Sequence, residues 1–148
     1  MSTPGEIIIE APRDKVWRAF FHPENAKKWL PDLVHYANTS GLPKQPGSTA
    51  KLVMLQNGRM LEMTETVLDR RDPYEYVARY DGAGFSNTVT FRFDDLGNGT
   101  TSLQTESDVR FKGLLRLIGW LFVGLARKKG RADLLRFKER LEAGELAD

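Results

Sequence analysis

The feature that most constrains the fold of this chain is an apolar segment that meets an amphipathic one near its start. Residues 6–10 read Glu-Ile-Ile-Ile-Glu and run directly into Ala11 and Pro12. Because proline has no backbone N–H for a sheet but suits the first turn of a helix, a strand must end here and a helix begin. The apolar residues that follow form one stripe at helical spacing: Val16, Trp17, Ala19 and Phe20.

A second short helix is predicted after the break at His22 and Pro23, and Pro31 ends it. This order of strand, helix and short helix resembles the START-like superfamily, whose bacterial members are often labelled polyketide cyclase or dehydrase-like. The resemblance continues through Lys28-Trp29-Leu30-Pro31 to a long last helix. It implies an α+β helix-grip fold: a curved antiparallel sheet of about seven strands, two short helices after the first strand, and a long C-terminal helix over the concave face. In that family the concave face encloses a cavity for an apolar small molecule.

Composition limits the classes of function. The 148 residues contain no linker-like tract, so we expect residues 1–148 to form a single domain. There is no cysteine, and the two histidines lie far apart in sequence, so we expect no disulfide, no metal site and no cofactor. A formal net charge of +2 does not indicate a nucleic-acid partner. The chain does not open with a charged segment followed by an apolar core, so we expect a cytoplasmic protein.

The middle of the chain reads as a series of hairpins. Asn57-Gly58 lies between two apolar runs, which is the strongest short hairpin signal in a sequence. Similar turn signals separate the remaining segments. The predicted strands are 33–39, 49–55, 60–68, 74–80, 85–93 and 100–109.

The hairpin at Asn57-Gly58 sets a register for the whole sheet. A two-residue turn places Leu55 opposite Met60, and side chains then alternate between the two faces. One face is polar almost throughout and meets water, so the other must be covered. The covered face is predicted to carry Leu52, Met54, Leu61, Met63, Glu65, Val67, Tyr76, Ala78, Tyr80, Phe85, Asn87, Val89, Phe91, Phe93, Thr101, Leu103, Thr105, Ser107 and Val109.

Glu65 is the one charged residue on the covered face. An isolated buried carboxylate is costly, so it must be paired, hydrogen-bonded or protonated. Two interpretations follow from the sequence. In the first, Glu65 lies near a strand end and reaches solvent, or a bulge turns it outward. In the second, it joins Tyr80 and Asn87 as the polar part of a mostly apolar pocket.

The C-terminal part, from residue 112 to about residue 143, is predicted to be helical. Its second half is amphipathic, but residues 114–125 are apolar nearly all round. One helix cannot bury every side against one sheet, so part of this surface lines a cavity, contacts a second copy of the chain or docks peripherally on a membrane. Interrupted by Arg116 and ended by Arg127, the run does not suit a membrane span. The basic run 127–131 is either a solvated helix face or a patch that faces phosphates or a membrane.

No catalytic constellation is evident, so the sequence leaves enzymatic activity open. The leading prediction is that the protein binds or transports a hydrophobic or amphipathic small molecule, such as a lipid, an isoprenoid or a polyketide-like compound. An alternative is a cyclase or dehydratase with Glu65 or His35 as acid or base. A second alternative is an interaction or membrane-docking module formed by residues 114–125, and the chain is expected to be a monomer or a homodimer. The predicted ligand-binding residues are Trp29, Met54, Met63, Glu65, Tyr76, Tyr80, Asn87, Val89, Phe91, Leu103, Thr105, Leu121 and Leu125.

Overall fold

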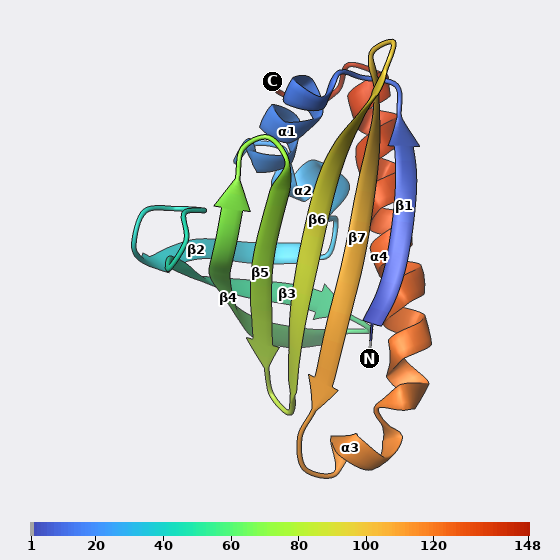
Figure 1. Ribbon diagram of the computed structural model, residues 1–148. Coiled ribbons are helices and arrows are strands. Elements are labelled where there is room, and N and C mark those ends of the chain that lie inside the picture. Colours follow the sequence, from blue (N-terminus) through green and yellow to red (C-terminus); the bar gives the residue numbers. More distant parts are fainter. Residues whose placement is uncertain (1) are drawn as a thin grey trace.

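The computed structural model describes residues 2–148 and contains one antiparallel sheet and four helices in this range (Figure 1). Helix α1 begins directly after Pro12, as the opening of the sequence predicts. The elements, in chain order, are β1 (Ser2–Ile9), α1 (Arg13–Phe21), α2 (Ala26–Trp29), β2 (Leu33–Ser40), β3 (Thr49–Gln56), β4 (Arg59–Arg71), β5 (Glu75–Gly82), β6 (Phe85–Gly97), β7 (Thr100–Phe111), α3 (Leu115–Ile118) and α4 (Trp120–Glu142).

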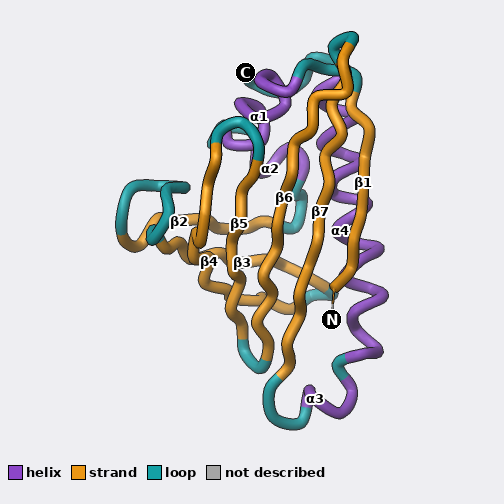
Figure 2. The backbone as a smooth tube through the Cα atoms, viewed as in Figure 1, coloured by secondary structure: helices purple, strands orange, loops and turns teal. Residues whose placement is uncertain are grey.

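The seven strands form a single sheet in the order β1-β7-β6-β5-β4-β3-β2. Figure 2 shows the sheet curving so strongly that β2 and β3 run across the direction of β5 and β6. Helices α1 and α2 lie at one end of the concave side, and α4 runs along it beside β1 (Figure 1). The chain therefore has the predicted α+β helix-grip fold.

The predicted register is confirmed from β3 to β7. Leu55 pairs with Met60 around the Asn57-Gly58 turn, and Glu65 pairs with Tyr80 on the next strand. Within β3 to β7, one irregularity that the sequence does not predict affects the concave face: a bulge between Val67 and Asp69 shifts the pairing at the end of β4. This bulge brings the next residue, Arg70, onto the concave side.

The long C-terminal helix begins later than the sequence predicts. A four-residue helix, α3, precedes α4, and the junction between them is Gly119. A Cβ atom at Gly119 would lie 2.3 Å from the Phe111 ring, so only glycine allows this close approach. The contact sets the rotation of α4 about its axis, which decides what the helix presents to the sheet.

An aromatic cluster holds α1 and α4 onto the sheet. Trp17 packs edge-on against Phe93 with ring centroids 4.9 Å apart, and Trp29 packs against Phe137 at 5.2 Å. Phe93 and Phe137 are fully buried. Aromatic pairs in such tilted or edge-on geometries each stabilise a fold by about 1 kcal/mol beyond the area that they bury. This cluster fills the end of the concave side beneath α1 and α2.

No helix within residues 2–148 is long and apolar enough to cross a membrane. The apolar run at residues 114–125, divided between α3 and the start of α4, fits this finding because it is short and interrupted.

Candidate ligand cavity

Beside the aromatic cluster, the concave face encloses a cavity of about 1220 Å³. Its walls come from the sheet, from α1 and α2, and from one side of α4. Exposed residues such as Lys27, Val34 and Arg127 are part of the lining, so the cavity opens to solvent between α2, β2 and α4. The predicted ligand-binding residues that line it are Trp29, Met54, Met63, Glu65, Tyr76, Tyr80, Asn87, Val89, Phe91 and Thr105.

Three predicted wall residues lie elsewhere. Leu103 is fully buried in the core opposite Phe93, at the end of the sheet that the aromatic cluster fills. Leu121 and Leu125 are 52% and 66% exposed because the Gly119 contact rotates them to the outer side of α4. The inner side of α4 instead contributes Val123, Ala126, Gly130 and Leu134 to the cavity.

Glu65 is the polar centre of the cavity. Its side chain is only 2% exposed, which contradicts the interpretation that it reaches solvent. The carboxylate accepts hydrogen bonds from the hydroxyl groups of Tyr36, at 2.8 Å, and Tyr80, at 2.7 Å. The Lys44 ammonium group lies 3.0 Å from Oε1 and 3.2 Å from Oε2. We call these four residues the Glu65 cluster.

The Glu65 cluster satisfies a buried charge from three separate segments. Tyr80 is the cross-strand neighbour of Glu65, Tyr36 comes from β2, and Lys44 comes from the loop between β2 and β3. Charge-assisted hydrogen bonds of this kind are about twice as strong as neutral ones. Together they offset the cost of removing the carboxylate from water.

The two tyrosines of the Glu65 cluster are held in their protonated form. Burial raises the pKa of each hydroxyl, and the negative charge of Glu65 raises it further. At neutral pH both hydroxyls therefore donate to the carboxylate. The cluster carries one negative and one positive charge, so the cavity keeps a polar, near-neutral centre.

Lys44 is held in an unusual conformation at the edge of this cluster. Its backbone is left-handed, with φ of 63°, which costs a residue other than glycine about 1–2 kcal/mol. Its ammonium group lies 4.6 Å from the centre of the Tyr36 ring, and its carbonyl oxygen accepts a hydrogen bond from Arg70 Nη1 at 3.1 Å. These contacts stabilise the strained loop and direct the side chain at Glu65.

Three further polar atoms of residues that line the cavity form no hydrogen bond within the described structure. They are the Tyr76 hydroxyl, Asn87 Oδ1 and the indole Nε1 of Trp29, and all three atoms are buried. Burial also raises the pKa of the Tyr76 hydroxyl, as does the nearby charge of Glu65, so this group remains a donor. Unpartnered buried polar atoms are uncommon in folded proteins and call for an explanation.

Three polar residues of the cavity, Tyr36, Lys44 and Arg70, are absent from the predicted ligand-binding residues. On β2 the sequence offers His35 only as an alternative acid or base. A bulge between Leu33 and His35 leaves His35 exposed at the rim and turns Tyr36 inward. Lys44 lies in a loop, where no periodicity indicates direction. Arg70 was expected in a turn, whereas it lines the cavity with its guanidinium 4.2 Å from the centre of the Phe21 ring.

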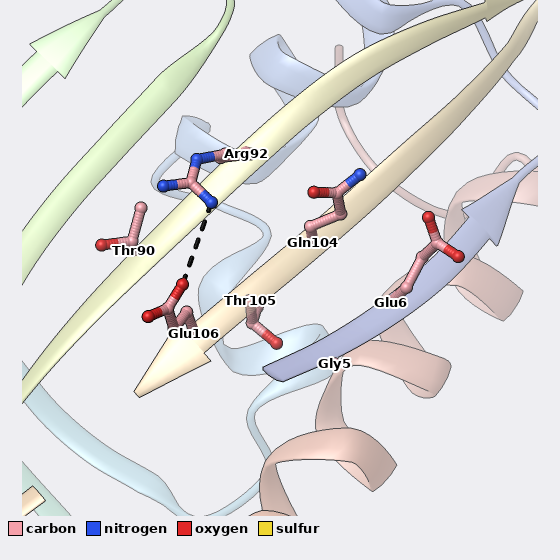
Figure 3. Close-up of a pocket in the computed structure, with 7 residues that line it drawn as sticks. All are labelled: Gly5, Glu6, Thr90, Arg92, Gln104, Thr105 and Glu106. Atoms are coloured by element: carbon pink, nitrogen blue, oxygen red, sulfur yellow. Dashed lines mark ion pairs between the residues drawn. The ribbon is translucent and has the colours of Figure 1, made fainter. Parts of the chain in front are cut away.

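A smaller cleft of about 350 Å³ lies on the convex face across β1, β7 and β6 (Figure 3). Figure 3 shows Arg92 and Glu106 pointing toward one another, and they form an ion pair at 3.9 Å. Gln104 donates to Asp94 at 2.9 Å, and Glu6 accepts from Ser102 at 2.6 Å. The charged groups of this cleft thus already have partners, so the larger cavity is the better candidate site.

The described residues also contain no group of three or more histidine, cysteine, aspartate or glutamate side chains that could hold a metal ion. The Glu65 cluster, a single carboxylate with two phenols and an amine, does not form a metal-binding set.

Residues 3–143 match the family described as polyketide cyclase / dehydrase and lipid transport. The chain belongs to this family. The match spans nearly all of β1, the two short helices, the hairpins and all of α4, so it covers every wall of the cavity. It supports the START-like resemblance that the sequence carries. No curated protein sequence matches this chain.

Solved structures share the fold at low sequence identity. A START superfamily protein from Mycobacterium smegmatis is 17% identical, with a TM-score of 0.80 over 96% of this chain and 97% of that one. A protein from Thermus thermophilus is 17% identical, with a TM-score of 0.79 over 97% and 99% of the two chains. The ZhuI aromatase/cyclase from Streptomyces sp. R1128 is 14% identical, with a TM-score of 0.77 over 96% and 93%. Family membership supports a ligand-binding or cyclase protein, and these structures establish the helix-grip fold.

Proposed function

We propose that the protein binds an amphipathic small molecule with an apolar body, such as a lipid, an isoprenoid or a polyketide-like compound. The observation that carries this proposal is a cavity of about 1220 Å³ whose mostly apolar walls surround the buried, paired carboxylate of Glu65. Pockets of about 300–1,000 Å³ hold drug-sized ligands, so this cavity has room for a ligand at the upper end of that range or larger.

The apolar walls supply most of the affinity. Met54, Met63, Val89 and Phe91 line the cavity and lie on the strands that curve around it. Each square ångström of apolar surface removed from water contributes about 25 cal/mol. The two methionines are unbranched and adaptable, which suits a pocket that accepts related ligands.

The polar atoms orient the ligand. The Tyr76 hydroxyl and Asn87 Oδ1 form no hydrogen bond of standard geometry among residues 2–148, although the Tyr76 hydroxyl lies close to Glu65. A ligand with an acceptor near Tyr76 and a hydroxyl near Asn87 would satisfy both atoms. The Glu65 cluster lies beside them and places Lys44 within reach of a partly anionic head group.

Ligand binding can be tested with a matched pair of variants on one strand. Glu65→Gln removes the buried charge, whereas Glu62→Gln removes an exposed one on the outer face of β4. Protein purified without detergent is analysed by native mass spectrometry and then titrated with a fluorescent fatty-acid probe. We expect an adduct or probe binding in the wild type and in Glu62→Gln, and an altered affinity in Glu65→Gln. Absence of both adduct and probe binding in the wild type would refute the proposal.

A second candidate is a cyclase or dehydratase in which Glu65 acts as acid or base. The hydrogen bonds from Tyr36 and Tyr80 favour it, because phenols that donate to a buried carboxylate can pass a proton to or from a bound ligand. The exposed side chain of His35 is the weaker candidate for this role. In that case Glu65→Gln would retain binding of a polyketide-like compound but lose its conversion, as followed by mass spectrometry of the product.

A further inference from the structure

Large apolar side chains are exposed along α3 and the first turns of α4. Their exposed fractions range from 45% at Ile118 to 84% at Leu114. Monomeric soluble proteins rarely expose so many apolar residues on one short segment unless it binds something. We call this the tip surface, and it consists of Leu114, Leu117, Ile118, Trp120, Leu121, Phe122 and Leu125.

The tip surface belongs to a well-anchored segment. The Lys112 amide donates to the Gly84 carbonyl at 2.9 Å, and the Leu115 side chain lies 2.6 Å from the position that a Cβ at Gly84 would take. Gly119 packs on Phe111 in the same close manner. The inward residues of the segment thus hold it to the sheet, and the outward apolar residues contribute little to the fold.

The charges within the segment that carries the tip surface are all of one sign. From Val109 to Ala132 the sequence has no aspartate or glutamate, and its basic residues are Arg110, Lys112, Arg116, Arg127, Lys128, Lys129 and Arg131. Arg110 pairs with Asp108, and Lys129 pairs with Asp32. Among residues 2–148, no carboxylate forms a salt bridge with Arg116, Arg127 or Lys128.

This combination favours one kind of partner. Two copies of the chain would bring like charges together, which opposes association through this surface. An anionic lipid surface offers both apolar chains and negative head groups. Amphipathic helices with basic flanks and an exposed tryptophan bind at such interfaces without crossing them.

The position of the tip surface also suits docking. Figure 1 shows α3 beyond the ends of β5, β6 and β7, at the opposite end of the molecule from α1 and the C-terminus. A protruding end can meet a flat surface without interference from the rest of the fold. The inner side of the same part of α4 lines the cavity with Val123 and Arg127, so docking there would bring this wall close to the bilayer.

We propose that α3 and the first turns of α4 dock the protein onto an anionic lipid bilayer. The tip surface enters the boundary between head groups and acyl chains, while Arg116, Arg127 and Lys128 contact lipid phosphates. The docking is peripheral and reversible. It is independent of what the cavity binds.

Co-sedimentation with vesicles tests the proposal. The wild type is expected to bind phosphatidylcholine vesicles that contain about a third phosphatidylserine, and to bind pure phosphatidylcholine vesicles more weakly. Leu121→Ser combined with Leu125→Ser is expected to lower the partition coefficient roughly tenfold per substitution. The matched control is Leu96→Ser, which alters a leucine of similar exposure, 54%, in the hairpin at the opposite end.

The charges are tested separately. Arg116→Gln and Lys128→Gln are each expected to weaken binding to anionic vesicles roughly fivefold and to reduce its dependence on salt. Neither residue lines the cavity. Glu65→Gln should leave vesicle binding unchanged, so failure of the docking proposal and failure of the cavity proposal give different results.

Tryptophan fluorescence reports the depth of docking. Trp17 and Trp29 are 5% and 7% exposed, whereas Trp120 is 65% exposed. A blue shift on adding anionic vesicles is therefore expected from Trp120, and Trp120→Leu should bind but lose the shift. The proposal is overturned if the wild type does not bind anionic vesicles. It is overturned too if the variant that combines Leu121→Ser and Leu125→Ser binds them as strongly as the wild type. It is also overturned if that variant only converts a dimer to a monomer.

Discussion

Lys44→Met is the substitution that best tests how the Glu65 cluster is stabilised. Methionine keeps most of the lysine stem but removes the ammonium group that lies 3.0 Å from Glu65. Both residues carry a Cβ atom, so the left-handed backbone at position 44 is equally costly before and after the change. The carboxylate would keep its two tyrosine donors and lose its only cation in the cluster.

The expected cost follows from the unequal burial of the two partners. Breaking a buried ion pair by removing one partner costs about 3–5 kcal/mol, because the other charge stays buried. Lys44 is 28% exposed and two hydrogen bonds to Glu65 remain, so we expect a loss of about 1–3 kcal/mol in the free energy of unfolding. For a chain of this length that corresponds to a fall in Tm of roughly 3–10 °C.

Removing the other partner of this ion pair should cost less stability. Glu65→Gln removes the buried charge and leaves Lys44, whose partly exposed ammonium group can turn to water. Adding Glu65→Gln to Lys44→Met should therefore restore part of the stability that Lys44→Met loses. Such a coupling is the signature of two residues in contact.

Urea unfolding followed by circular dichroism measures these differences, and Lys51→Met is the matched control. Lys51 pairs with Glu62 on the outer face, where the two side chains are 50% and 61% exposed. Exposed pairs contribute at most about 1 kcal/mol, so the control should be nearly neutral. If Lys44→Met were no more destabilising than Lys51→Met, the argument that Lys44 neutralises a buried charge would be wrong.

Two further predictions concern the α4 junction and the tyrosines. Gly119→Ala would place its Cβ 2.3 Å from the Phe111 ring and should destabilise the fold by about 1–3 kcal/mol. The Cβ of Gly124→Ala would meet open space, so this substitution should stabilise the fold by up to about 1 kcal/mol. Thermal melts of the two variants measure the difference. The raised pKa values of Tyr36 and Tyr80 mean that both hydroxyls stay protonated above pH 10, where an unfolded chain ionises its tyrosines. The stability that these two groups contribute is present below that pH and lost above it, so ultraviolet titration should show late ionisation that coincides with alkaline unfolding. Ionisation of every tyrosine near pH 10 without unfolding would contradict this reasoning.

The register of the sheet was predictable from local signals in the sequence, whereas the helix-grip architecture was implied by the resemblance to the START-like superfamily. Asn57-Gly58 specifies a two-residue turn, and a strand has a side-chain period of two, so one turn assigns a face to every residue on the neighbouring strands. The contrast between a polar and an apolar face is continuous across four strands. The turn signal and the alternation of polar and apolar residues are local properties, so both can be read from a single sequence.

The position of Glu65 on the covered face was also predictable, but its partners were only partly so. Tyr80 follows from the register because it is the cross-strand neighbour. Tyr36 faces inward only because of a bulge in β2, and Lys44 reaches Glu65 from a loop through a left-handed backbone. Neither feature leaves a periodic signal, since bulges and loops interrupt the alternation on which such signals depend.

The sequence alone determined that this chain forms an antiparallel sheet with one apolar face that carries Glu65, followed by a long helical region. Only the tertiary structure decided whether the space above that face is filled or open, and which side of the last helix looks into it. The contact between Gly119 and Phe111 turns Leu121 and Leu125 outward and Val123 inward, and the aromatic cluster stops short of Glu65. Both outcomes depend on how side chains distant in sequence pack against one another, and no local pattern along the chain encodes that packing.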